Sequence, residues 1–162
     1  MKGYCRIKPD WLAVKNVDRG ILVEDVPQVA LKNNNGNWQP IAFGREADLA
    51  PANDRNAVIV NGFKHPRVII DDFEAAELVF KHFLKKANLT AGLFTGAPIL
   101  IFHYIEPVAG GLSKIETRAL TDLGFRLGAK NIYLLSSHEA PNELTDGEIR
   151  DFEKNLVEHT IR

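Results

Sequence analysis

Residues 98–135 read PILIFHYIEPVAGGLSKIETRALTDLGFRLGAKNIYLL, and this stretch decides the fold. Its first five residues, 98–102, form a continuous apolar run, which is typical of a strand covered on both faces. The SKIE capping-box pattern then predicts a helix over 113–128. A second apolar run follows at 132–135. This order of strand, helix and strand predicts a right-handed crossover between parallel strands of an α/β sheet.

Two further helices are indicated on either side of this unit. Over 71–87 the apolar residues recur at helical spacing, with aspartates at the start and lysines at the end to complement the helix dipole. After the unit, Thr145 and Glu148 form another capping-box pattern, which predicts a helix over 145–160.

The first third of the chain is rich in short β-prone runs separated by turn residues. Short strands joined by tight turns are antiparallel, because parallel strands need a longer crossover. A brief helix is expected near 45–49. We therefore predict one α/β domain over residues 1–162, with a mixed sheet, antiparallel N-terminal strands and flanking helices. The expected early strands are Trp11–Val14, Ile21–Val23, Gln28–Leu31, Ile41–Phe43, Val58–Val60 and Val68–Ile70.

The composition excludes several classes of function. Twenty basic and twenty-one acidic residues leave the chain almost neutral, which argues against nucleic acid as a partner. Cys5 is the single cysteine, so no internal disulfide and no cysteine-based zinc site is expected. No apolar run is long enough to span a membrane or to act as a signal peptide. The expected location is the cytoplasm, without peripheral membrane contact through the N-terminal basic residues.

The five histidines provide the best candidates for a chemical site. None of them pair at the spacing of metal ligands, so no metal or other cofactor is expected. His138 and Glu139 follow a predicted strand, and the ends of parallel strands are where α/β proteins build their sites. With His103 they form the alternative hypothesis, a small-molecule or enzymatic site that requires all three side chains to converge on one pocket.

The last predicted helix carries a single apolar stripe made by Ile149, Phe152 and Leu156. Such a stripe is buried either against the chain's own sheet or against a second molecule. The three residues are therefore candidates for an interface, in a weak homodimer or with another protein.

Four blocks of sequence, in order and at close to the expected spacing, resemble the first part of rod-shape-determining bacterial actin homologues of the MreB type. Together they run from about residue 20 to residue 135 and consist mostly of scaffold. The blocks are GILVEDVP (20–27), IAFGREA (41–47), GFKHPRVIIDDF (62–73), and the PV, SKIETRA and LGAKNIYLL segments within 107–135.

The resemblance implies an actin-like first lobe, and the chain departs from the family where the chemistry lies. In the family, a D-L-G-T-x-N-T loop between the first two strands holds a phosphate. Ungapped alignment places residues 4–10 there, with Tyr4 for the acid, Arg6 for the glycine and Ile7 for the threonine. Glycine permits close approach of backbone N–H groups to phosphate, and Pro9 removes a donor.

The other catalytic parts of the family are also missing from the sequence. No D-x-G-G-G-T loop occurs, and Ser136 and Ser137 stand where the family has a carboxylate, with Glu139 a few residues later. The resemblance therefore predicts a truncated first lobe without ATPase activity. The expected function is a non-catalytic, actin-like domain that acts through protein contacts, linked to cell shape or the bacterial cytoskeleton.

Overall fold

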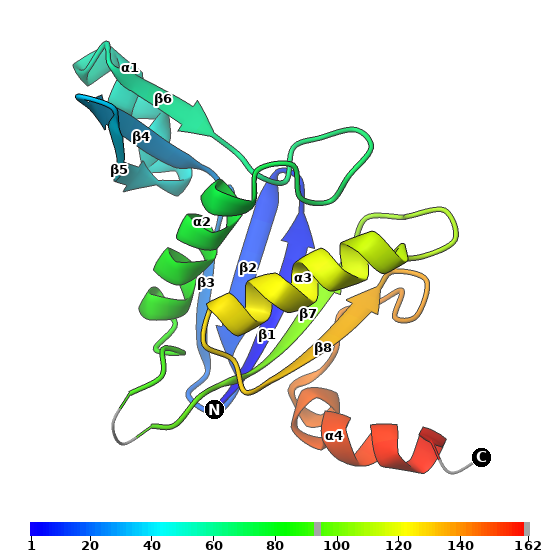
Figure 1. Ribbon diagram of the computed structural model, residues 1–162. Helices are drawn as coiled ribbons and strands as arrows, with labels where there is room; N and C mark the ends of the chain where they lie inside the picture. Colours follow the sequence, from blue (N-terminus) through cyan, green and yellow to red (C-terminus); the bar gives the residue numbers. More distant parts are fainter. Residues whose placement is uncertain (93–94, 161–162) are drawn as a thin grey trace.

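The computed structural model of the chain describes residues 1–92 and 95–160, with the backbone alone for residues 52–53 and 155–160. It contains a five-stranded sheet in the order β3-β2-β1-β7-β8 and a three-stranded sheet in the order β5-β4-β6 (Figure 1). The predicted α/β class with a mixed sheet is confirmed. The strands of the large sheet are β1 (Lys2–Lys8), β2 (Trp11–Asn16), β3 (Ile21–Asp25), β7 (Ile99–Tyr104) and β8 (Asn131–Ser136).

The large sheet combines both kinds of strand pairing. β1 pairs with β2, and β2 with β3, in antiparallel register, as predicted for the N-terminal strands. β1 then pairs with β7, and β7 with β8, in parallel register. Helix α3 (Lys114–Arg126) connects the two parallel strands, which confirms the crossover predicted from residues 98–135.

Helices cover both faces of this sheet. Helices α2 (Phe73–Lys86) and α3 lie on one face, as Figure 1 shows, and their apolar side chains join the main core. Successive residues of a strand point to opposite faces. Cys5 and Leu100 accordingly face the main core, whereas Tyr4 and Ile101 belong to a second cluster that also includes Ile149 of α4 (Asp146–Thr160).

The three long helices begin at the residues that their capping patterns indicate. Asp72 accepts a hydrogen bond from the Ala75 amide, and both hydrogen bonds of the Ser113–Glu116 capping box are present. Thr145 and Glu148 form the corresponding bonds at α4. Ile115, in the first turn of α3, does not join the core, since its side chain is 82% exposed.

The small sheet stands beyond the end of α2 (Figure 1). A core of alanines packs one of its faces against η1 and α1, and the inner end of the other face packs on the main core through Val29, Phe43 and Val60. The Phe43 ring stacks on His82 of α2 at 4.1 Å between centroids. The strands of the small sheet are β4 (Val29–Asn34), β5 (Asn37–Phe43) and β6 (Ala57–Val60). The two short helices between β5 and β6 are η1 (Gly44–Leu49) and α1 (Ala50–Asn53).

Two sequence expectations about strands are corrected. Residues 4–8 lie in β1, so the loop assigned to 4–10 is a hairpin whose turn consists of Pro9 and Asp10. The β-prone run Val68–Ile70 forms no strand, because it pairs with neither sheet, and Ile69 is buried in the core as part of an irregular segment. No helix in the described part of the chain has the length and apolarity needed to cross a bilayer.

Candidate functional site

The carboxyl ends of β1 and β7 form the edge of the sheet where a site is expected in an α/β protein. A hollow of about 620 Å³ lies there beside the β1–β2 hairpin. Three elements contribute to it: the hairpin itself, the end of β7, and the segment between β8 and α4. Its lining side chains are Arg6, Lys8, Asp10, Trp11, Ile105, Pro141 and Glu143.

The basic side chains in this hollow are already paired with acids. Arg6 forms an ion pair with Glu143, and its guanidinium lies 4.9 Å from the centre of the Trp11 ring. The Lys8 ammonium is 3.9 Å from the carboxylate of Glu106. Surface pairs of this kind leave little net positive charge to attract an anion.

The hairpin backbone is not arranged as a phosphate cradle. Its turn contains Pro9, which has no N–H, and contains no glycine. The Pro9 carbonyl accepts a hydrogen bond of 2.8 Å from the side-chain amide of Asn61, so the turn is fixed against the segment that leaves the small sheet. A cradle needs several backbone N–H groups converging on one point, and this two-residue turn does not provide them.

His103, the first residue of the alternative site, lies in the middle of the fold. Its side chain is fully buried on the α4 side of β7. Nε2 is 2.8 Å from the Ala140 carbonyl, and Nδ1 is 2.6 Å from the Tyr4 hydroxyl. Since a carbonyl can only accept, Nε2 carries the proton and Nδ1 accepts from Tyr4. Burial lowers the pKa of His103 below its usual value.

Tyr4 extends this arrangement into a chain of hydrogen bonds. Its hydroxyl accepts from the Leu144 amide at 3.2 Å and donates to His103. Burial raises the pKa of Tyr4 above its usual value, so the phenol stays protonated. These hydrogen bonds attach the segment between Ala140 and Leu144 to the sheet, so His103 has a structural role.

His138 and Glu139 lie elsewhere. Both are exposed, and they line a separate hollow of about 240 Å³ that opens beside Gly111 and Thr117 of the α3 region and does not include His103. The Glu139 carboxylate accepts from the amide and the hydroxyl of Ser136 at 2.9 and 3.0 Å. The three residues of the alternative hypothesis therefore do not converge on one pocket.

The structure packs the described part of the α4 stripe, Ile149 and Phe152, within the chain rather than presenting it as an open surface. Ile149 is fully buried in the second cluster with Tyr4 and Ile101. Phe152 is half-buried and meets the Tyr133 ring edge-on, with centroids 5.4 Å apart. The side chain of Leu156 lies outside the described residues. This packing makes α4 the cover of the second sheet face.

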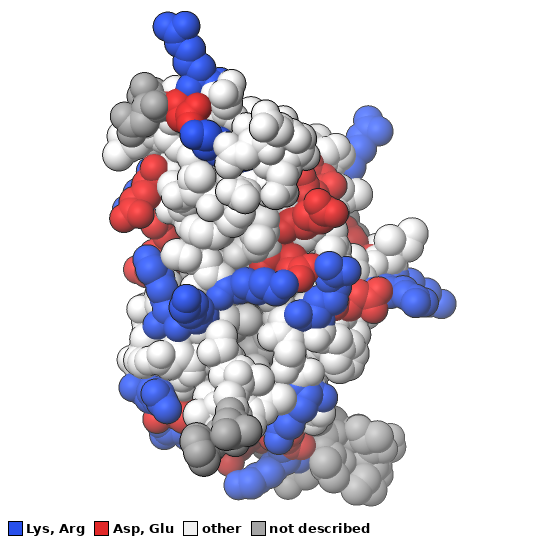
Figure 2. All heavy atoms as spheres, turned by 60° about the vertical axis from the view of Figure 1, so that its left-hand side comes forward, with Lys and Arg blue, Asp and Glu red and all other residues white. Residues whose placement is uncertain are grey.

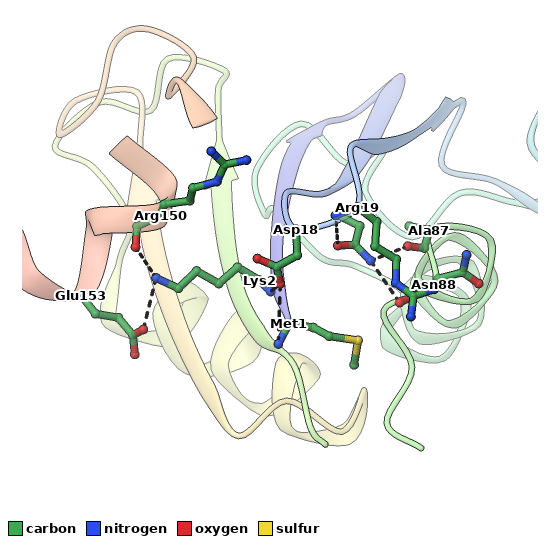
Figure 3. A network of polar contacts seen from close by, with 9 residues as sticks. Met1, Lys2, Asp18, Arg19, Ala87, Asn88, Arg150 and Glu153 are labelled. Carbon is green, nitrogen blue, oxygen red and sulfur yellow. Dashed lines mark hydrogen bonds and ion pairs between the residues drawn. The ribbon is translucent and has the colours of Figure 1, made fainter. Parts of the chain in front are cut away.

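Charge pairs reinforce the same contact. Lys15 of β2 lies 2.5 Å from Asp146, and Lys2 of β1 lies 3.3 Å from Glu153 (Figure 3). With the Arg6–Glu143 pair, three basic residues of the two strands face three acids of the 143–153 segment. The Lys2 ammonium also donates to the Arg150 carbonyl.

The rest of the network in Figure 3 fixes the start of β1. The Lys2 amide donates to Asp18 at 2.9 Å, and the terminal amine lies 3.7 Å from the same carboxylate. From the end of β2, Asn16 donates through its side-chain amide to the carbonyls of Ala87 and Asn88 at the end of α2. The network therefore links the N-terminus to two helices that lie on opposite faces.

Sequence reasoning missed the partners of His103 and the three ion pairs that hold the 143–153 segment. Tyr4 and His103 are 99 positions apart, and no local pattern relates them. A weak signal was available in the alternation of Lys2, Tyr4, Arg6 and Lys8, which places these side chains on one face of a strand.

Comparison with known proteins gives one curated relative and a set of solved structures. The chain is 30% identical over 117 residues to the cell shape-determining protein Mbl of Bacillus subtilis (strain 168). It matches MreB5 of Spiroplasma citri bound to ADP with a TM-score of 0.62 and 17% identity. It matches a non-polymerising MamK mutant bound to AMPPNP with a TM-score of 0.65 and 16% identity. The MamK double helical filament gives 0.61 and 15%.

The chain spans only about a third to two-fifths of the length of the relatives that it matches. The Mbl match covers 72% of this chain and 32% of Mbl. The structural matches cover 85% of this chain, 39% of the MreB5 chain and 41% of each MamK chain. No model of a protein family matches the sequence. These likenesses establish an actin-like fold, and the resemblance to MreB-type proteins holds in both sequence and structure.

Proposed function

We propose that this chain, whose sequence and fold resemble part of MreB-type actin homologues, is an actin-like module that acts through protein contacts and without a nucleotide. Its place in the cell, on this proposal, is the cytoplasm, at the cytoskeleton that determines cell shape. Its partners are a filament of MreB type or a second copy of the chain. Mbl is described as cell shape-determining, and MamK forms a double helical filament, which supports this direction.

The observation that carries the proposal is the structure of the β1–β2 hairpin. MreB5 and the MamK mutant were solved with bound nucleotides. In this chain the turn holds Pro9 and Asp10, and the adjacent Arg6 is paired with Glu143. A triphosphate would have to break that pair, and it would find few free backbone donors to replace it. Binding energy from this half of a nucleotide site is therefore small.

Two measurements test the proposal. Isothermal titration of the chain with ATP and Mg²⁺ is expected to give no binding, and an affinity in the micromolar range would overturn the proposal. Co-sedimentation with polymerised MreB-type filaments is expected to carry the chain into the pellet, without dependence on ATP added to the chain. If the chain stays in the supernatant and also remains a monomer, the proposed role in protein contacts is contradicted.

A new chemical site at His103, His138 and Glu139 has less support. The first residue is buried under the segment before α4, and the other two are exposed on a different hollow. Glu139 and His103 already form hydrogen bonds within the chain, Glu139 with Ser136 and His103 with the Ala140 carbonyl. We therefore assign His103 and Glu139 to the stability of the fold.

A further inference from the structure

The two sheets end in four edge strands, and proteins normally protect such strands from pairing with other molecules. β3 carries Glu24 and Asp25 at its end, and β5 contains Pro40, which has no N–H to donate. β8 is flanked on both faces, because Ile132 packs in the main core and Tyr133 packs in the second cluster under α4. Charge, proline and covering helices thus protect three of the four edges.

The fourth edge strand, β6, has neither charge nor proline, and among the described side chains its only helical cover is at Ala57, which packs with Ala47 and Ala50 of η1 and α1. Its sequence, Ala57-Val58-Ile59-Val60, contains four apolar residues, no charge and no proline. Val58 and Ile59 point to opposite faces, and their side chains are 44% and 38% exposed. Within the described part of the chain, residues 58–60 form backbone hydrogen bonds with β4 alone. The outer row of N–H and C=O groups is therefore available.

The surface beside this edge is also apolar. Val58 lies opposite Leu31 of β4, and Leu31 lies opposite Pro40 of β5, so the three side chains form a row across the small sheet. Trp38, which is 48% exposed, continues the row on the same face. No charged residue occupies these positions. In Figure 2 the upper part of the molecule, where the small sheet lies, has a white surface with acidic and basic side chains around and beside it.

We propose that β6 pairs in antiparallel register with β6 of a second copy, about a two-fold axis, and joins the two small sheets into one of six strands. This inference rests on the proposed function, in which the chain acts through protein contacts. An open edge selects an extended segment, and an apolar edge exposed on both faces selects one without charges. β6 itself has both properties, and pairing two uncharged strands opposes no like charges.

The size of the contact sets the strength of the association. Two strands of four residues bury less surface than the roughly 1,200–2,000 Å² of a stable interface. The dimer is therefore weak and depends on concentration. Its detection requires protein concentrations from about 10 micromolar to about 1 millimolar, where a contact of this strength becomes populated.

Sedimentation equilibrium of matched lysine variants tests the proposal. The native chain is expected to show a monomer–dimer equilibrium, and Val58→Lys is expected to weaken it about tenfold or more, because it places two like charges within the short contact between the strands. Leu22→Lys is the control, since Leu22 lies on the β3 edge with a similar exposure of 47%. A native chain that is monomeric throughout, or a dimer equally strong in both variants, would overturn the proposal.

Disulfide trapping gives an independent test that does not depend on affinity. Cys5 is fully buried, so a cysteine added at the surface is the one accessible thiol. Val58→Cys and Ile59→Cys are made separately, since the register decides which of the two lies nearer the axis. At least one of them is expected to form a covalent dimer on mild oxidation, whereas Leu22→Cys is not. Equal trapping at all three positions would indicate random collision and contradict the pairing.

The same variants separate this inference from the proposed function. A monomeric Val58→Lys variant that still co-sediments with MreB-type filaments supports the β6 contact and leaves the proposed function intact. ATP binding by the native chain would remove the proposed function, while the trapping experiment would still report on β6. Before either comparison, circular dichroism and the unfolding midpoint confirm that each variant is folded.

Discussion

The hydroxyl of Tyr4 lies 2.6 Å from Nδ1 of His103, in the centre of a buried hydrogen-bond chain that runs from the Leu144 amide to the Ala140 carbonyl. Every member of this chain has a fixed role as donor or acceptor. Protonation of His103 would place a second donor on the ring, facing a hydroxyl that already accepts from Leu144. The chain therefore requires a neutral imidazole.

This requirement predicts that stability falls in mild acid. Burial lowers the folded-state pKa of His103 below the unfolded value of 6.5. Between those two values the unfolded chain binds one more proton, so the free energy of unfolding rises with pH in that window. The contribution of His103 to the free energy of unfolding is complete above pH 6.5 and is lost as pH falls toward the folded-state pKa. The total loss is about 1.4 kcal/mol for each unit by which the folded-state pKa lies below the unfolded one. Urea unfolding at a series of pH values measures it.

Histidine variants identify the source of that pH dependence. Burial also lowers the pKa of His82, so each histidine is replaced separately. His103→Gln is expected to flatten the profile below pH 6.5, and His82→Gln is expected to leave the His103 part in place. A His103→Gln protein with an unchanged pH profile would show that the buried chain does not control the titration.

The packing of α4 predicts a large effect at Ile149. Its side chain is fully buried, so Ile149→Ala leaves a cavity between α4 and the sheet and is expected to cost about 2–5 kcal/mol of unfolding free energy. Phe152→Ala is expected to cost less, because Phe152 is half-buried. Lys154→Ala, at an exposed position of the same helix, serves as the control. If Ile149→Ala matches the control in its urea midpoint, α4 is not packed against the sheet in solution.

The pair between Lys15 and Asp146 predicts a measurable coupling. Lys15→Glu is expected to destabilise the chain by about 1 kcal/mol, because it faces the acids of the α4 segment, and the double variant with Asp146→Lys is expected to recover most of the loss. The coupling energy from this double-mutant cycle should decrease at high salt. The exposed Asp151–Lys154 pair within α4 provides a reference cycle. If the effects of the two single substitutions on the free energy of unfolding are additive at low salt, the pair does not help to hold α4 on the sheet.

Two helical glycines predict opposite responses to alanine. A Cβ on Gly124 would lie 2.6 and 2.8 Å from side-chain atoms of Ile132, so Gly124→Ala is expected to force α3 away from β8 and to cost about 1–3 kcal/mol. At Gly147 the nearest atom would be 3.9 Å away, and Gly147→Ala is expected to be neutral or to stabilise α4 by up to about 1 kcal/mol. Thermal unfolding of both variants compares them, and equal effects would contradict the close approach of α3 to β8.

Local patterns predicted the elements that have a signal of their own. The capping residues Ser113 and Thr145 marked the starts of two helices, and the apolar run at 98–102 marked the central parallel strand. The β-prone run at Val68–Ile70 failed, because a strand also needs a partner edge, which local propensity does not report. The alignment placed the family's loop over residues 4–10, and the structure has strand β1 at residues 4–8, whose side chains alternate between two sheet faces.

The sequence by itself determined the α/β class, the crossover over residues 98–135 and the absence of glycine from the hairpin turn, because each depends on residues close together in the chain. The tertiary structure alone decided what the buried and charged side chains contact. It placed Tyr4 against His103, folded Ile149 of α4 onto the second sheet face, and left β6 at an open edge. These outcomes depend on which distant segments pack together, and packing selects contacts by shape and charge that no short stretch of sequence contains.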